Sequence, residues 1–594
     1  MTDNLDRLDE RQLICRDIGT AWLLFCAIAA FLLFAVWSFA LPVFESPDEP
    51  QHWLNARYIH DHLRLPPYNA TYYEGNQAPL YYIVMAPFAF PDSGPPLAPC
   101  GPRQYLHCSA EVAKYWPIRF VRLLTALLST GTVLLTILAG FAATRKIHLA
   151  FLAGAFVVCL PQFSVRGSSI SNDAMVTACS AAATYFLVRF LQTCHWRMAW
   201  WCSVACGLAL LSKLNAAMFP VVLAGAVLTA PAPWKVRISR LQLLLLAVAI
   251  ILPWLIRNWF LYGDPTGEAA MLTTIPGLVN PRSIRSLYFR TTFLQMVFQS
   301  FVGVFGWMTL YMTDRIYRIY AAVAAAGGLG LLYGLIRRKF NPRVVIGLFA
   351  VMMLCALLLV RLNLTFPQPQ GRLLFPALPA LAVLLAMGFG ALPKWNRICS
   401  VAVAAGVAAL NLYVLTSLIL PAFWQPSVPK EYVDIWVPDS LMKGPAPVLS
   451  PGHRFTQSFI SQHNHLYAVE VEVSNYMKRP RQGTIHMTLR EGGIEGIDAA
   501  PIAAVDIPAN SIKNCCLYAR LQFKPISGSA GKLYYVSLET EKILDDDKVT
   551  VFLSDHVVYP PGRFYLDGGP MEKDTTFITF FLEPPALCPV CGVR

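Results

Sequence analysis

The stretch AWLLFCAIAAFLLFAVWSFALPV, Ala21 to Val43, contains no charged residue. An α-helix needs about 20 predominantly apolar residues to cross the hydrocarbon core of a bilayer, so this run predicts a membrane-spanning helix. The run is longer than the apolar core of a signal peptide and lacks a small-residue cleavage site, which predicts that it is retained. Comparable runs recur as far as Pro421. We therefore expect a polytopic α-helical membrane protein.

The composition and the placement of charge support this expectation. Hydrophobic residues make up 56% of the 594 residues and charged residues 14%, which is too apolar for a soluble chain. Much of the net charge of +13 lies in short loops between apolar runs. These basic loops are Arg145–Lys146, His195–Arg197, Lys235–Arg240, Arg337–Arg343 and Lys394–Arg397. Because cytoplasmic loops are enriched in Lys and Arg, the pattern predicts roughly eleven spans, a cytoplasmic N-terminus and an extracytoplasmic C-terminus. The charge thus indicates topology, and we expect no nucleic-acid partner.

Two domains are expected. Residues 1–421 form the membrane domain, which includes a long first extracytoplasmic loop at 44–116. The apolar segment 290–312 is rich in Gly and Gln, and we expect a re-entrant or interfacial helix there, with an additional span as the alternative. Residues 422–594 form an extracytoplasmic domain.

The second domain has the pattern of an antiparallel β-sandwich. Short runs of alternating residues are separated by joints that contain Gly, Pro, Asn and Asp. The runs are LYAVEVEVSNY, GTIHMTLREG, LYARLQFKPI, KLYYVSLETE and KVTVFLS. This spacing predicts a jelly-roll-like all-β sandwich.

Cysteines on the predicted outer face are expected to form disulfides, because that compartment is oxidising. They are Cys100, Cys108, Cys515, Cys516, Cys588 and Cys591. The Cys588-Pro-Val-Cys591 spacing supplies only half of a zinc site, so metal binding and redox chemistry remain alternatives.

The stretch FESPDEPQHW, Phe44 to Trp53, follows the first apolar run directly and carries the main candidate for chemistry. It places Asp48, Glu49 and His52 beside a membrane border, where carboxylates repel one another and lose solvation unless they have a partner. One alternative is a helix N-cap at Asp48 or Ser46, with Pro50 in the first turn. A cap explains one carboxylate, whereas the whole cluster suits a general base.

Further polar residues lie at the predicted outer ends of spans. Tyr81 and Tyr82 end the first outer loop and are candidate substrate-binding residues, with an interfacial aromatic belt as the alternative. Asn172 and Asp173 begin a later span, where Asp173 is either part of a site or an N-cap.

Three cations lie at the same predicted face, namely Lys213, Arg257 and Arg372. The topology rule disfavours positive charge on the outer side, so these residues require another explanation. Snorkelling is one alternative, and binding a phosphate is the other. Carboxylates that act as a base and cations that hold a phosphate together predict group transfer from a lipid-phosphate-linked substrate.

These pieces resemble the GT-C superfamily of integral-membrane glycosyltransferases, and most of all a bacterial group filed as a domain of unknown function whose hallmark is PDE-x-x-H. The matching segments are PDEPQH at 47–52, NQAPLYY at 76–82, SISNDA at 169–174, RNWFLYGDPTG at 257–267 and QGRLLFPALPAL at 370–381. The chain departs from many relatives at Gln77-Ala78, where a basic residue or His precedes two prolines.

The resemblance implies a GT-C-like fold and specific roles for residues. Asp48 is implied as the catalytic base, Glu49 as a second acid, and His52 as the group that orients a carboxylate or the donor. The donor phosphate is implied near Arg257 or Arg372. Some GT-C enzymes need a divalent cation such as Mg²⁺ or Mn²⁺ and others do not, and Asp48 with Glu49 supplies too few ligands to decide between them.

The implied activity is hexosyl or pentosyl transfer from a polyprenyl-phosphate-linked sugar to a cell-envelope glycan, lipid or protein. The implied location is the outer face of a bacterial cytoplasmic membrane. A transporter, flippase or polymerase for a lipid-linked glycan is the alternative. By analogy with GT-C enzymes that carry outer sandwich domains, the second domain is expected to bind glycan, with Trp424 and Trp436 either stacking on sugars or packing in the core.

Overall fold

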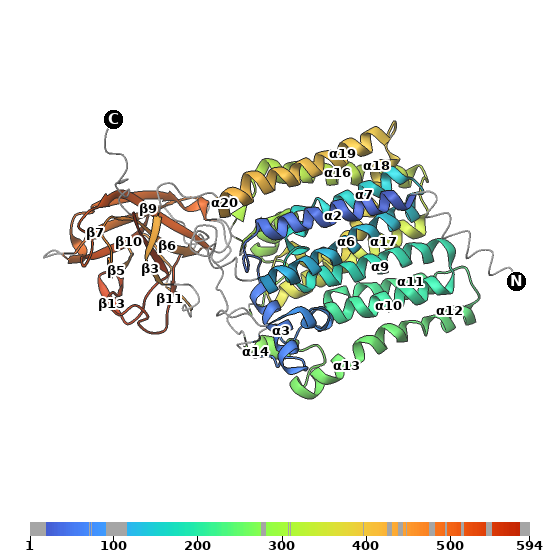
Figure 1. The fold of residues 1–594 in the computed structure, drawn as a ribbon, viewed down its shortest axis with the longest axis horizontal. Helices are drawn as coiled ribbons and strands as arrows, with labels where there is room; N and C mark the ends of the chain where they lie inside the picture. The colour runs from blue at the N-terminus through green and yellow to red at the C-terminus, as the bar shows by residue number, and fades with distance from the viewer. Residues whose placement is uncertain are drawn as a thin grey trace. The chain divides into compact units, whose positions relative to one another are not determined.

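The computed structural model describes residues 19–582 with internal gaps. The residues not described in this range are 70–71, 73, 91–115, 275–278, 280, 307, 309, 396, 425–430, 438–443, 447, 475–481, 493–495, 513–515 and 542–548. The chain divides into two compact units, Met1–Gln425 and Pro426–Arg594. The first is helical and the second is built from strands (Figure 1).

The helical unit is a bundle of roughly parallel rods (Figure 1). Among the described residues, eight helices are long and apolar enough to cross a membrane. They contain α2 (Thr20–Ala40), α6 (Trp116–Thr144), α9 (Asn172–Thr193), α12 with α13 (Trp234–Leu241 and Leu244–Tyr262), α16 (Asp314–Ile336), α17 (Pro342–Thr365), η7 with α18 (Gly371–Ala377 and Leu378–Ala391), and α19 with η8 and α20 (Arg397–Val414, Leu415–Ile419 and Leu420–Trp424).

Shorter helices pack among these long ones. They are α7 (Ile147–Val158) with α8 (Pro161–Arg166), α10 (Trp196–Ser212), and η4 (Leu214–Ala216) with α11 (Met218–Leu228). In the described part of the chain, α10 packs on α9 and α13, and α7 packs on α6 and α18. The chain is thus a multi-pass helical membrane protein. Its described residues contain eight helices long enough to span and two shorter apolar ones, Ile147–Val158 and Leu214–Leu228, where the sequence predicted roughly eleven spans.

Successive helices alternate in direction, so the bundle has two chemically different ends. The basic loops Arg145–Lys146, His195–Arg197 and Arg337–Arg343 all connect helices at one end. The opposite end collects the C-terminus of α2, the N-terminus of α9 and the start of η7. We call this opposite end the site end. It also carries α3 (Glu49–His62) and α4 (Leu80–Met85), from the predicted first outer loop.

The apolar segment at 290–312 does not form a span. It folds as a π-helix, η6 (Tyr288–Phe293), continued by α15 (Leu294–Val302) and a small hairpin of β1 (Val304–Phe305) with β2 (Leu310–Tyr311). The two helical pieces together rise only roughly 22 Å, which is less than the ~30 Å of a hydrocarbon core. The alternative of an additional span is therefore wrong.

Glycines allow some of these elements to approach closely. A Cβ on Gly388 of α18 would lie 1.9 Å from the carbonyl oxygen of Gly327 in α16, so only glycine permits that backbone contact. A Cβ on Gly371 would lie 2.3 Å from the backbone nitrogen of Phe301. Gly371 therefore fixes the start of η7 directly against α15.

The second unit contains two main antiparallel sheets. One has the order β13-β12-β5-β10-β7-β8, and the other has the order β3-β14-β6-β9. The strands are β3 (Glu431–Val437), β4 (Gly444–Pro445), β5 (Arg454–Ile460), β6 (Leu466–Ser474), β7 (Thr484–Glu491), β8 (Ala503–Pro508), β9 (Cys516–Ile526), β10 (Leu533–Glu541), β11 (Phe552–Leu553), β12 (Phe564–Leu566), β13 (Gly569–Met571) and β14 (Phe577–Leu582). One apolar core, with Phe459, Val471 and Phe577 among its members, takes residues from both sheets, as in a sandwich.

The predicted strands recur as β6, β7, β9 and β10, whereas KVTVFLS yields only the two-residue β11. Trp436 lies in β3 with its side chain 43% exposed, so it is not a core residue, and the side chain of Trp424 lies outside the described residues. The cysteines expected to form disulfides also lie outside the described residues, except for the backbone of Cys516 in β9.

Candidate active site

The turn between α2 and α3 is strained at two positions. Phe44 and Asp48 have φ values of 69° and 65°, in the left-handed region that non-glycine residues adopt only at a cost. Asp48 occupies the N-cap position of α3, and Pro50 lies in the first turn. However, the Asp48 side chain makes no capping hydrogen bond. Asp48 therefore stands at the N-cap position without capping the helix through its side chain, and its carboxylate is directed to other partners.

Glu49 is held in a buried ion pair. Its carboxylate accepts hydrogen bonds from Nε and Nη2 of Arg122 at 2.7 and 2.6 Å, and from the backbone N–H groups of Phe44 and Ile170 at 2.9 Å each. Both side chains are fully buried. Because both carboxylate oxygens of Glu49 already accept hydrogen bonds, Glu49 is poorly placed to contact a substrate. The geometry indicates a structural role for Glu49 in place of the second catalytic acid expected from the sequence.

Arg122, on α6, connects the same turn to the end of α2. Its guanidinium donates to backbone carbonyl oxygens there, those of Ser38 at 2.9 Å, Leu41 at 2.7 Å and Pro42 at 2.7 Å. Arg122 was not among the site residues predicted from the sequence. An arginine inside the apolar helix that begins with WPIRFVRLL is the signal that could have indicated a buried charged partner.

Asp48 forms an ion pair with Arg372 and remains accessible. Its carboxylate accepts a hydrogen bond from Nη2 of Arg372, and its side chain is 21% exposed. Burial raises the pKa of the Asp48 carboxyl, but the guanidinium groups of Arg372 and Arg166 outweigh burial and lower it to about 2. Asp48 is thus an ionised carboxylate that a substrate can approach.

The carboxylate of Asp173 lies close to cationic side chains from several elements. Its carboxylate lies 3.1 Å from Nε of Arg166 on α8, 2.6 Å from Nζ of Lys213 after α10, and 3.8 Å from Nη1 of Arg372. The N-cap alternative for Asp173 is wrong, because Ser171 is the cap and accepts the Asp173 backbone N–H. Asp48, Asp173, Arg166, Lys213 and Arg372 form what we call the charged cluster.

Arg166 joins the charged cluster to the strained turn. Its Nη1 donates to Oγ of Ser46 at 2.7 Å and to the carbonyl oxygen of Pro47 at 2.6 Å, directly before Asp48. Its side chain is fully buried. Arg166 was also not predicted from the sequence, although a lone arginine at the end of the apolar stretch before GSSISNDA is a visible signal.

His52 belongs to a hydrogen-bonded chain that leads to Lys213. Its Nδ1 lies 2.8 Å from the hydroxyl of Tyr82, and the two rings stack. The Tyr82 hydroxyl in turn lies 3.5 Å from Nδ2 of Asn172, whose Oδ1 accepts from Nζ of Lys213 at 3.3 Å. Burial lowers the pKa of His52 to about 3, so its imidazole is neutral near pH 7.

Tyr81 and Tyr82 are both buried, at 0% and 2% exposure, so the interfacial-belt alternative is wrong for them. The Tyr81 hydroxyl lies 2.7 Å from Oγ1 of Thr125 and accepts the backbone N–H of Ser171 at 3.1 Å. Tyr81 therefore positions the loop before Asp173, whereas Tyr82 contacts His52 directly.

Glu74 is a further acidic residue at this end of the bundle. Its backbone carbonyl accepts from Nδ2 of Asn55 at 2.9 Å, which fixes the loop to α3. Burial, together with the negative charge of Asp48, raises the pKa of Glu74 to about 7. Glu74 was not among the site residues predicted from the sequence, although it lies two residues before NQAPLYY.

Arg257 lies against other partners. Its Nη2 donates to the carbonyl oxygen of Pro66 at 2.8 Å, and its Nη1 donates to Oδ1 of Asn258 at 3.2 Å. Of the two arginines considered for the donor phosphate, the structure therefore brings Arg372 to Asp48 and uses Arg257 to hold the loop after α3.

The described residues supply few donors for a divalent cation. No group of three or more His, Cys, Asp or Glu side chains among them could hold a metal ion. The carboxylates of Asp48 and Asp173 are already paired with cationic side chains. This donor set does not fit Mg²⁺ or Mn²⁺, which take several oxygen ligands.

Several solved structures are similar to this chain at low sequence identity. ArnT from Cupriavidus metallidurans, bound to undecaprenyl phosphate, is 14% identical with a TM-score of 0.43, over 68% of this chain and 74% of that one. The archaeal oligosaccharyltransferase AglB from Archaeoglobus fulgidus is 12% identical with a TM-score of 0.38, over 68% of this chain and 56% of that one. The arabinosyltransferase EmbB from Mycobacterium smegmatis is 10% identical with a TM-score of 0.35, over 93% of this chain and 64% of that one.

No curated protein matches the chain in sequence. Residues 107–257 match the family model described as dolichyl-phosphate-mannose-protein mannosyltransferase. This segment contains Arg122, Arg166, Asp173 and Lys213. The part of the chain that is similar to a glycosyltransferase family is therefore the part that supplies most of the buried charge around Asp48.

Proposed function

We propose that the protein is a GT-C-type membrane glycosyltransferase that transfers one sugar from a polyprenyl-phosphate donor to a cell-envelope glycan, lipid or protein. The observation that carries the proposal is the accessible, ionised carboxylate of Asp48, held beside Arg372. The family match supports it, because the description of that family names a sugar carried on dolichyl phosphate, which is a polyprenyl-type lipid.

In the proposed reaction, the acceptor hydroxyl gives its proton to Asp48 while its oxygen forms a bond to the anomeric carbon of the sugar. The bond between that carbon and the phosphate oxygen breaks, and the electron pair leaves with the polyprenyl phosphate. Arg372 and Lys213 stabilise the negative charge on the departing phosphate. Because Asp48 is a weak base, most of the rate gain must come from positioning and electrostatics.

The charges of the cluster suit an anionic leaving group. Arg166, Lys213 and Arg372 supply three positive charges, and Asp48 and Asp173 supply two negative ones. A phosphate can therefore replace part of the carboxylate contact of Arg372 without leaving a cation unpaired. His52, Tyr82 and Asn172 are uncharged and polar, which suits hydrogen bonds to the hydroxyl groups of a hexosyl or pentosyl unit.

We place the reaction on the extracytoplasmic side of a bacterial cytoplasmic membrane. The charged cluster lies at the site end of the bundle, opposite the basic loops, and the positive-inside rule assigns those loops to the cytoplasm. The same rule puts the strand-built unit after α20 outside the cell. A transporter for a lipid-linked glycan would place ionisable groups along a path through the middle of the spans. The charged cluster instead gathers at helix ends.

Mass spectrometry of membrane lipids tests this proposal. Cells that produce Asp48→Asn are expected to accumulate a polyprenyl-phosphate sugar and to lose the glycosylated product, and the mass of the accumulated lipid identifies the donor. Asp61→Asn is the matched control, because Asp61 is an exposed carboxylate on α3 that pairs with Arg57. If Asp48→Asn leaves the lipid and product levels of wild type unchanged, Asp48 is not the base and the proposal fails.

A further inference from the structure

Three arginines converge at the end of the bundle that carries the basic loops. They are Arg237 and Arg240 of α12 and Arg343 of α17, and we call them the arginine cluster. Arg240 donates from Nη1 to the carbonyl oxygen of Cys194 at 3.0 Å, and Arg343 donates from Nη1 to Sγ of the same cysteine at 3.4 Å. Two guanidinium groups from different helices therefore meet at the end of α9.

The arginine cluster also reaches the end of α11. Arg237 donates from Nη1 to the carbonyl oxygen of Leu228 at 2.9 Å, and Arg343 donates from Nη2 to that of Thr229, the next residue. Carbonyl oxygens at a helix C-terminus attract cations, which accounts for part of this arrangement. A helix C-terminus carries roughly half a negative charge, so the two helix ends supply about −1 against the three positive charges of the arginines. About two positive charges are left to compensate.

The described acidic residues do not supply this counter-charge. The sequence contains no Asp or Glu between residues 174 and 263, or between residues 315 and 430. The described acidic residues of the helical unit all lie at the site end, and they are Glu45, Asp48, Glu49, Asp61, Glu74, Asp173, Asp264, Glu268 and Asp314. An anion from outside the described chain is therefore needed to balance the arginine cluster.

The arginine cluster lies at the depth of lipid headgroups. The helix α9, the α12–α13 pair and α17 are each long and apolar enough to cross a membrane, and the cluster lies where they begin or end. Trp196 and Trp234 are the first residues of α10 and α12, and their side chains are 48% and 62% exposed. Exposed tryptophans at the ends of spans are typical of the border between hydrocarbon and water.

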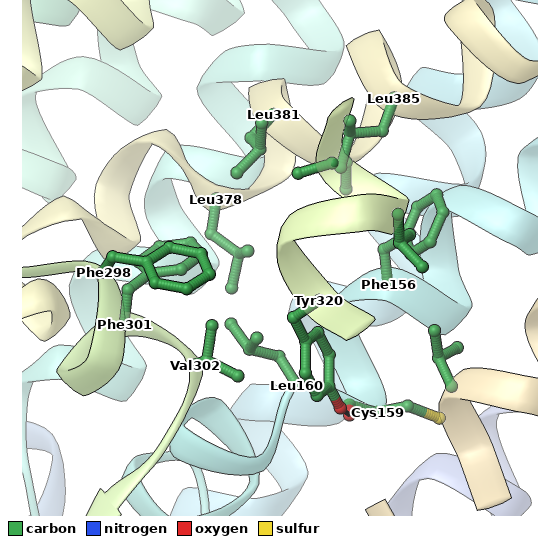
Figure 2. Close-up of a pocket in the computed structure, with 14 residues that line it drawn as sticks. Phe156, Cys159, Leu160, Phe298, Phe301, Val302, Tyr320, Leu378, Leu381 and Leu385 are labelled. Carbon is green, nitrogen blue, oxygen red and sulfur yellow. Dashed lines mark hydrogen bonds between the residues drawn. The ribbon is translucent and has the colours of Figure 1, made fainter. Parts of the chain in front are cut away.

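The apolar cavity of the helical unit does not offer a second place for an anion (Figure 2). Phe156, Tyr320 and Leu381 are among the described residues that line it, and none of the lining residues is charged. A phosphate placed there would lose its solvation without gaining a cation. The arginine cluster is therefore the better candidate.

We propose that the arginine cluster binds the headgroup of one anionic glycerophospholipid. Each guanidinium has five N–H donors, and its contacts with carbonyl oxygens and with the Cys194 sulfur use only part of them. The free donors suit the oxygens of a phosphodiester. Basic residues between membrane helices recognise anionic headgroups in this way.

A phospholipid fits this surface better than a free phosphate does. Val236 and Ile238 of α12 are 37% and 42% exposed, next to Arg237 in the sequence. They give the short helix an apolar surface for acyl chains, which inorganic phosphate lacks. The inference is independent of the proposed function, because the arginine cluster and Asp48 lie at opposite ends of the bundle.

Native mass spectrometry of the full-length protein in detergent tests the inference. The probe is phosphatidylglycerol, and phosphatidylcholine with the same acyl chains is the neutral comparison. We expect one tightly bound phosphatidylglycerol and no comparable binding of phosphatidylcholine. Each basic side chain near an anionic lipid contributes about fivefold in affinity, so replacing all three arginines by glutamine is expected to weaken binding about a hundredfold. Inorganic phosphate at the same concentration is not expected to compete.

Two matched variants separate a built site from general surface charge and from a purely structural role. The triple change Arg145→Gln, Arg337→Gln and Arg338→Gln removes three exposed arginines at the same end of the bundle and is expected to weaken binding less than about fivefold. Replacing the three arginines of the cluster by lysine keeps their charge but loses the forked hydrogen bonds, and is expected to weaken binding by about tenfold or less. Thermal unfolding in phosphatidylcholine identifies the folded fraction of each variant.

Several results would overturn the inference. Equal binding of phosphatidylglycerol and phosphatidylcholine would show that no anionic headgroup is recognised. An equal loss in the Arg145, Arg337 and Arg338 variant would assign the effect to general surface charge, and equal losses in the lysine and glutamine variants of the cluster would assign the arginines a structural role. Competition by inorganic phosphate would assign the cluster to a soluble anion. Binding that occurs only after removal of residues 1–18, which include five acidic residues, would assign the cluster to that segment of the chain.

Discussion

Asp48 and Glu49 are adjacent carboxylates in one turn, and replacing each by its amide is expected to have a different effect. Glu49→Gln is expected to lose stability, and Asp48→Asn is expected to lose turnover. Glu49→Gln leaves the guanidinium of Arg122 buried at 0% exposure without a counter-charge. Removing one partner of a buried ion pair costs about 3–5 kcal/mol, because the other charge stays in a medium of low dielectric constant. We expect Glu49→Gln to destabilise the protein by this amount.

Asp48→Asn is expected to cost far less stability. Arg372 keeps its hydrogen bond from Nε to Gln370 and its approach to Asp173 at 3.8 Å. The Asp48 side chain is also 21% exposed, so water can solvate what the substitution leaves behind. We expect a loss of about 2 kcal/mol or less, the range for one hydrogen bond to a charged group. Loss of a general base, in contrast, lowers the rate by about 10²–10⁴.

The assay combines thermal unfolding of purified protein in detergent with turnover measured at a temperature where both variants are folded. The expected pattern is a large fall in melting temperature for Glu49→Gln, and a near wild-type melting temperature with lost turnover for Asp48→Asn. A Glu49→Gln variant that melts like wild type but lacks activity would refute the reasoning, because it would give Glu49 a chemical role. Equal destabilisation by both substitutions would refute it as well.

Three further predictions concern positioning, charge and packing. Arg166→Lys cannot hold Ser46 and Pro47, which Nη1 contacts, and Asp173, which Nε contacts, at the same time, so kcat per folded molecule is expected to fall about tenfold or more while KM for the donor stays within about twofold. A normal kcat per folded molecule would contradict this role. Glu74 ionises as the pH rises through its pKa of about 7, and its carboxylate then repels the donor phosphate. KM for the donor is therefore expected to rise between pH 6 and pH 8 in wild type but not in Glu74→Gln. Identical pH profiles of KM in the two proteins would contradict this role. Gly371→Ala places a Cβ 2.3 Å from the backbone nitrogen of Phe301. The substitution is expected to destabilise the protein by about 1–3 kcal/mol, measured by thermal unfolding. A stability equal to that of wild type would show that α15 and η7 can separate freely.

Apolar periodicity and basic loops were sufficient to predict the membrane helices and the alternation of their ends. The strand runs from Leu466 to Glu541 were also predictable, because strict alternation of apolar and polar residues is a local signal. The structure of the segment after Arg257 was harder to predict, because an apolar run of intermediate length can form either a short packed helix or a span. Its outcome depends on contacts of α15 with η7 and α8, which no local pattern reports.

The site was predictable in its residues and not in their pairing. Asp48, Asp173, Lys213 and Arg372 are distant in sequence, and only the packed helix ends bring them together. The opposite situations of Asp48 and Glu49 follow from the left-handed backbone at Asp48, which sends neighbouring side chains toward different partners. Sequence spacing cannot report such a local reversal of direction.

Two buried arginines were not predicted from the sequence. Arg122 lies within the apolar helix α6 and Arg166 is the last residue of α8, and a buried charge implies a specific partner. Each is tied to the FESPDEPQHW turn, Arg122 through Glu49 and Arg166 through Ser46 and Pro47. Arg122 is recognisable in the sequence as a charge inside an apolar helix, and Arg166 as a lone arginine at the end of an apolar stretch.

We propose that this chain breaks the bond between a sugar and a polyprenyl phosphate with Asp48 as the base. The most direct test is a single-turnover reaction of the purified protein in liposomes with the lipid-linked sugar that accumulates in Asp48→Asn cells, followed by mass spectrometry of the lipid. Wild-type protein and Asp61→Asn are expected to release free polyprenyl phosphate in step with glycosylated acceptor, and Asp48→Asn is expected to release less than about a hundredth as much. Release of polyprenyl phosphate by Asp48→Asn at the wild-type rate, or movement of the intact lipid-linked sugar across the bilayer without its cleavage, would contradict the claim.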